Sequence, residues 1–151
     1  MFSGVSEINL DAKGRMAMPT RYRERIADRC DGKMFVTVDP FDQCLTLHTL
    51  PEWEIVQQKL NSVPSFDPAT RRLKRLVIGH ASEVDMDGSG RLLLPAPLRD
   101  FAEIERRIVL LGQGNKFEIW SERLWHQTRD AYLDVSEGAG LVPNDLKTLS
   151  L

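Results

Sequence analysis

The chain has 151 residues, of which 42% are hydrophobic and 28% are charged, and its formal net charge at pH 7 is −2. This balance is typical of a folded globular protein and excludes both a disordered chain and a membrane-spanning one. The slightly acidic total also excludes a uniformly basic protein that coats nucleic acid. Because Glu7 and Asp11 do not fit a secretory signal, we expect a cytoplasmic protein that contacts no membrane.

A repeat organises the first two thirds of the sequence. Shifting the chain by 76 residues aligns residues 8–23 with residues 84–99, and apolar residues recur between the identical ones. A fixed register of this kind indicates an internal duplication. The identical pairs are Asp11/Asp87, Gly14/Gly90, Arg15/Arg91, Pro19/Pro95 and Arg23/Arg99.

Each copy predicts the order β, β, α, β, β, α. Alternating apolar residues indicate two short strands joined as a hairpin by a tight turn, then a short helix and two more strands. In the first copy these elements cover residues 8–10, 16–18, 21–28, 34–38 and 45–48. In the second copy they cover residues 84–86, 92–94, 97–105, 107–111 and 117–120.

Helices are predicted between and after the copies. Apolar spacing indicates helices at 51–60 and 69–78, and the matching Trp53 and Trp125 mark the helix that follows each copy. A unit of about 50 residues buries too little apolar surface to be stable alone, so we expect a shared core. The fold class is therefore α+β, mainly β. The expected divisions are 5–52 for repeat 1, 53–80 for a helical connector, 81–124 for repeat 2, and 125–151 for a C-terminal helix and a poorly ordered or partner-dependent tail.

Charge is distributed unevenly along the chain. Residues 13–29 contain six basic and two acidic side chains, a local charge of +4, whereas four acids and one lysine occur from residue 130 onward. The basic segment includes the first of two Asp-x-x-x-Arg turns. It therefore predicts where an acidic protein could still contact a polyanion.

The two Asp-x-x-x-Arg turns are the candidate binding site. A carboxylate four residues before an arginine can hold the guanidinium in one rotamer and leave its other donors free for phosphate or a guanine edge. The alternative is that both pairs are internal salt bridges that only fix the turns. The first turn carries Lys13 at its tip where the second carries Ser89, so we expect unequal contributions. The candidate residues are Asp11, Lys13, Gly14, Arg15, Asp87, Gly90 and Arg91, with Arg21 and Arg23 of the following helix as further candidates.

This pair of turns, each followed by proline, a short helix and two strands, resembles the MraZ family of bacterial regulators, whose repeats are of the SpoVT-AbrB type. The resemblance implies a pseudo-dimeric, swapped-hairpin β-barrel in which the two ββαββα repeats interlock, with flanking helices. It also implies a ring-shaped homo-oligomer that binds double-stranded DNA through the turns. The implied role is that of a nucleoid-associated transcriptional regulator, acting on short direct repeats upstream of its own operon of division and cell-wall genes.

Other classes of function have little support in the sequence. The two cysteines, Cys30 and Cys44, lack metal-ligand spacing, and His48, His80 and His126 form no catalytic or metal motif. We therefore expect no metal, no cofactor, no small-molecule substrate and no enzymatic activity. The alternative to a DNA-binding regulator is an oligomeric scaffold or partner-binding ring that makes no direct contact with DNA.

Overall fold

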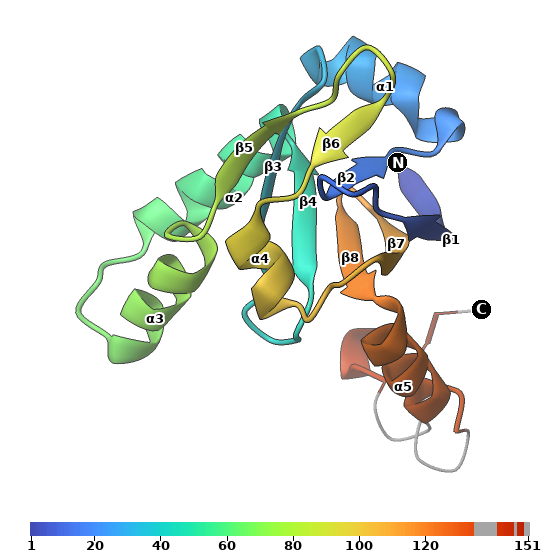
Figure 1. Ribbon diagram of the computed structural model, residues 1–151. Helices are drawn as coiled ribbons and strands as arrows, with labels where there is room; N and C mark the ends of the chain where they lie inside the picture. The colour runs from blue at the N-terminus through green and yellow to red at the C-terminus, as the bar shows by residue number, and fades with distance from the viewer. Residues whose placement is uncertain (135–141, 147, 150–151) are drawn as a thin grey trace.

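Eight strands and five α-helices form the part of the chain that the structure describes, residues 1–134, 142–146 and 148–149. In this computed structural model the predicted order β, β, α, β, β, α occurs twice, with one further helix, α3, between the copies (Figure 1). The first half contains β1 (Phe2–Asn9), β2 (Arg15–Ala17), α1 (Thr20–Cys30), β3 (Lys33–Val38), β4 (Leu45–Thr49), α2 (Leu50–Ser62) and α3 (Pro68–Val77). The second half contains β5 (Ser82–Asp85), β6 (Arg91–Leu93), α4 (Ala96–Phe101), β7 (Arg107–Gly114), β8 (Phe117–Ser121), α5 (Glu122–Tyr132) and a short 3-10 turn (Asn144–Leu146).

The strands of the two repeats are exchanged. Six strands form one antiparallel sheet in the order β1-β7-β8-β4-β3-β5, so the first strand of each repeat pairs with the third strand of the other. Strand β1 pairs with β7 over its whole length, from Phe2 opposite Gly114 to Asn9 opposite Arg107. The central pair, β4 and β8, also joins the repeats. Neither repeat therefore has a complete sheet of its own.

The remaining strands, β2 and β6, form a separate two-stranded antiparallel sheet, called the ribbon below. The hairpins expected between residues 8–10 and 16–18, and between residues 84–86 and 92–94, are therefore wrong. Strand β1 pairs with β7, β5 pairs with β3, and β2 pairs with β6. The tight turn is present, but an eight-residue partner gives β1 far more backbone hydrogen bonds than the three-residue β2 could. No closed barrel is found in residues 1–134 either, since β1 and β5 stay at the two edges of an open sheet.

The main core lies between one face of the sheet and the ribbon. Alternate residues of β3, β4, β7 and β8 point into it, which is the period expected of strands. Helix α1 contributes Tyr22 and Ile26, which are one helical turn apart and almost fully buried. Met16 and Leu92 close the core from the ribbon, and both are fully buried. The two repeats thus share one core.

The other face of the sheet is covered by helices that follow each repeat. Trp53 on α2 stacks on Phe35 with ring centroids 5.3 Å apart, and Trp125 on α5 lies 5.7 Å from Trp120. Helices α2 and α3 contact β3, whereas α5 contacts β7 and β8, so the helices occupy opposite ends of this face (Figure 1). Within the described residues, no helix is both long and apolar enough to cross a membrane.

One helix boundary differs from the expected elements, and part of the expected tail falls outside the described residues. Helix α4 ends at Phe101, earlier than predicted, because Glu103 has a left-handed φ of 55° that a helix cannot continue through. His48 lies near the end of its strand as expected, and it is buried there against the Trp53 ring. The prediction of a poorly ordered tail concerns mainly residues 135–141, 147 and 150–151, which lie outside the described residues.

The buried His48 predicts a pH-dependent stability. Burial lowers its pKa from 6.5 to about 4, so the folded protein holds a neutral imidazole where the unfolded chain would bind a proton. The unfolded state is therefore favoured as the pH falls from about 6.5 towards 4, and we expect a loss of about 2 kcal/mol between pH 7 and pH 5. Urea unfolding of the wild type and of His48→Gln measures this. An equal pH dependence in the two proteins would contradict the assignment.

Candidate nucleic-acid interface

The first Asp-x-x-x-Arg turn is closed by the carboxylate of Asp11. Its Oδ1 accepts hydrogen bonds from the backbone amides of Lys13 (2.9 Å) and Arg15 (2.8 Å), and its Oδ2 accepts one from Arg15 Nε (2.7 Å). The Arg15 amide is the main cause that lowers the pKa of Asp11 below its ordinary value. The carboxylate therefore stays ionised at neutral pH and orients both the turn and the guanidinium.

The second turn repeats this geometry. Asp87 Oδ1 accepts from the amides of Ser89 (2.9 Å) and Arg91 (2.9 Å), and Oδ2 accepts from Arg91 Nε at 3.2 Å. The pKa of Asp87 is lowered mainly by the Arg91 amide. In both turns the carboxylate accepts from the guanidinium through Nε only. The terminal nitrogens of the two guanidinium groups have no partner among the residues that the structure describes.

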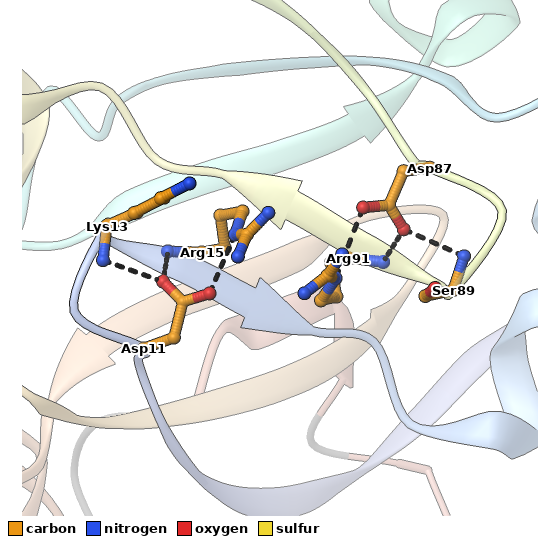
Figure 2. Close-up of polar contacts among 6 residues, drawn as sticks. All are labelled: Asp11, Lys13, Arg15, Asp87, Ser89 and Arg91. Atoms are coloured by element: carbon orange, nitrogen blue, oxygen red, sulfur yellow. Dashed lines mark hydrogen bonds and ion pairs between the residues drawn. The ribbon is translucent and has the colours of Figure 1, made fainter.

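The ribbon brings the arginines of the two turns together. Arg15 pairs with Leu93 and Ala17 with Arg91, so both arginines lie on the face opposite the buried Met16 and Leu92. Figure 2 shows the two guanidinium groups lying between the two aspartates, with Lys13 at one end and Ser89 at the other. Residues 76 positions apart therefore form one outward-facing surface. We call this surface the ribbon face; its corners are Arg15, Ala17, Arg91 and Leu93.

A second pair of arginines, Arg23 and Arg99, packs against the glycines of the two turns. Arg23 Nε donates to the carbonyl of Met18 (2.7 Å), and its side chain lies against Gly90 of the other repeat. By the same geometry Arg99 Nε donates to Leu94 (3.0 Å) and lies against Gly14. A Cβ at Gly90 would stand 2.3 Å from Arg23 Nε, so the close approach requires glycine. The turn of each repeat is thus held by the helix of the other.

The remaining predicted site residues lie at different places. Lys13 is exposed at the tip of the first turn, where no side-chain hydrogen bond holds its ammonium group within the described residues. Arg21 is exposed on α1, where Nη2 donates to Ser6 Oγ (2.6 Å) and the guanidinium lies 4.6 Å from the Tyr22 ring centroid. The side chains of Arg21 and Arg23 therefore contact other residues of this chain. The structure therefore groups Lys13, Arg15 and Arg91 at the ribbon face and gives Arg23 a packing role.

The duplicated fold can be compared with known families. The sequence profile of the MraZ protein family matches this chain twice, over residues 1–76 and 77–137. The chain belongs to the MraZ family. Curated relatives named "Transcriptional regulator MraZ" align over the full length of both chains. They include those of Halorhodospira halophila (49% identical), Alkalilimnicola ehrlichii (50%) and Pseudomonas aeruginosa (46%).

Two residues of this MraZ-family chain were not assigned a place at the site from the sequence. Arg99 recurs with Arg23 in the repeat alignment, but only the folded chain brings each against the opposite turn. Leu93 stands on the ribbon face with 52% of its surface exposed, between two residues that point inward. Alternation along the strand indicates that Leu93 points outward, because its neighbours Leu92 and Leu94 are the inward-facing residues.

A further polar cluster lies away from the ribbon, where β3 turns into β4. Asp39, Cys44 and Glu118 are buried there. One carboxylate oxygen of each acid and the sulfur of Cys44 all lie within 4.8 Å of one another. Asp39 is bound by backbone amides of the turn, and Glu118 accepts from the Trp120 ring nitrogen at 2.9 Å. Burial raises the pKa of the Cys44 thiol, so it stays protonated at neutral pH. This cluster packs the turn against β8.

Two glycines of the second turn provide a matched test of the contact between Arg23 and Gly90. Gly90 has a φ of 77° and no room for a Cβ, whereas a Cβ on Gly88 would meet nothing within 4 Å. We expect Gly90→Ala to lower the free energy of unfolding by about 1–2 kcal/mol, because a side chain strains the left-handed backbone and displaces Arg23. Gly88→Ala should leave it nearly unchanged. Equal unfolding midpoints in the two variants would contradict this account of the turn.

Proposed function

We propose that this chain is a sequence-specific DNA-binding transcriptional regulator that reads duplex DNA with the ribbon face. The observation that carries the proposal is the pair of guanidinium groups held on one outward surface by Asp11 and Asp87, with their terminal nitrogens unpartnered among the described residues. Two donors on one planar group match the two acceptors that guanine presents in the major groove. The name of the relatives, transcriptional regulator MraZ, supports the same role.

The shape of the ribbon supports major-groove binding. A two-stranded antiparallel sheet fits the width of that groove, and its outer side chains then face the base edges. Here the inward residues Met16 and Leu92 fix the ribbon on the core, so the outward residues are presented on a rigid base. Rigid presentation limits the entropy lost when the arginines bind.

Several subunits would supply the affinity. One ribbon face offers two arginines and Lys13 on a chain whose net charge is −2, which is little for tight binding by a single copy. In the ring assembly that we propose, several ribbon faces engage successive direct repeats, so that their phosphate contacts add. The proposed target lies upstream of the operon of division and cell-wall genes that contains its own gene.

Removal of one guanidinium tests the proposal. Arg15→Ala should weaken retardation of DNA from upstream of its own gene by about tenfold or more, because one bidentate contact to a base is worth about 1–3 kcal/mol. The unfolding midpoint should change little, since an exposed ion pair contributes about 0–1 kcal/mol. Arg72→Ala removes an equal charge from the exposed surface of α3 and serves as the control. If Arg15→Ala binds like the wild type, or if no protein retards the DNA, the scaffold alternative is favoured.

The tip of each turn gives a second, independent test. Lys13→Ser should reduce the slope of log K against log salt concentration by about 0.9 for each subunit bound, because one phosphate contact is lost. Ser89→Lys places a cation at the equivalent tip and should raise the slope by a similar amount. Titrations at four salt concentrations measure both variants. Identical slopes in all three proteins would mean that the turn tips do not approach the phosphates.

A further inference from the structure

The ribbon face has one exposed apolar corner. Leu93 lies opposite Arg15 on the neighbouring strand, and 52% of its surface is accessible. Its neighbours Leu92 and Leu94 are fully buried, so Leu93 is the apolar residue of β6 that lies outside the core. An exposed leucine at this corner gives the folded chain little hydrophobic stabilisation.

The equivalent corner of the first repeat carries Ala17. The repeat alignment matches Ala17 with Leu93, and both lie on the ribbon face, each opposite an arginine. The fold therefore accommodates a small residue at this position. Packing of the ribbon therefore does not require the larger side chain of Leu93.

Leu93 stands at the same end of the ribbon as Lys13. Because β2 and β6 are antiparallel, the end of β6 at Leu93 lies beside the start of β2 at Arg15, which directly follows the first turn. Figure 2 shows Lys13 and Arg15 at this first-turn end and Ser89 and Arg91 at the other. The strand register adds Leu93 to the first end and Ala17 to the second. The ribbon is therefore symmetric in its backbone and asymmetric in its chemistry.

We infer that Leu93 recognises thymine by packing against its C5 methyl group in the major groove, next to the base contacted by Arg15. This methyl is the only apolar group among the major-groove base edges, and apolar side chains are its usual partners. The inference rests on the proposed function. It also gives each ribbon a defined orientation on the DNA, because the thymine contact and the Lys13 contact occur at one end only.

Replacement of thymine by deoxyuridine tests this assignment, because it removes the methyl and leaves the base pairing intact. The full-length protein is titrated with the shortest upstream duplex that it retards, in which thymines are replaced one at a time. We expect one position in each bound element to weaken wild-type binding by about fourfold, the factor for burial of one methyl-sized group. Leu93→Ala should bind the unmodified duplex about fourfold more weakly and should lose nothing further at that position.

A matched control and separate outcomes make the test decisive. Ile55→Ala shortens an exposed apolar side chain on α2 and should keep the wild-type response to deoxyuridine. Binding that is insensitive to every replacement overturns the role of Leu93 and leaves the proposed function intact. A Leu93→Ala protein that remains sensitive at the same position assigns the methyl contact to another residue. Absence of any binding by the wild type overturns the proposed function itself.

Discussion

Hydrogen bonding between strands of opposite repeats is the constraint on which the rest of this structure depends. Strand β1 is bonded to β7 and β5 to β3, so each repeat completes the sheet of the other. The same exchange leaves β2 and β6 outside the main sheet, and they pair with each other instead. The ribbon face therefore exists only when both repeats are folded together. Sequence-distant turns become neighbours through backbone pairing rather than through a side-chain network.

At the ribbon, arginine is used in two opposite ways. Arg15 and Arg91 are oriented outward by carboxylates of their own turns, and they keep their terminal donors unused within the described chain. Arg23 and Arg99 are directed inward, where each lies beneath a glycine of the other repeat and donates to a backbone carbonyl. The inward pair fixes the height and shape of the turns. The outward pair can then be presented with little loss of side-chain freedom.

The sequence predicted the elements well and their partners less well. Alternation and turn residues located the eight strands, although for β1 only its last two residues, and the Asp-x-x-x-Arg spacing predicted the two ion pairs of the turns. Alternation tells which face of a strand is buried, however, and not which strand lies beside it, so the local hairpin was the wrong choice for β1. The burial of His48 was not predicted for a related reason. Strand β4 is buried on both faces, and periodicity cannot reveal the helix that covers the second one.

Fusion of the two repeats into one chain has a consequence for how the ribbon can change over time. Two identical chains paired in this way would have identical turns, and every substitution in one turn would also appear in the other. Here each turn is encoded separately, and the pairs Lys13/Ser89 and Ala17/Leu93 have already diverged. One end of the ribbon can be altered while the other is kept. In a symmetric dimer both ends of this surface would have the same chemistry. In the duplicated chain the two ends can contact different chemical groups.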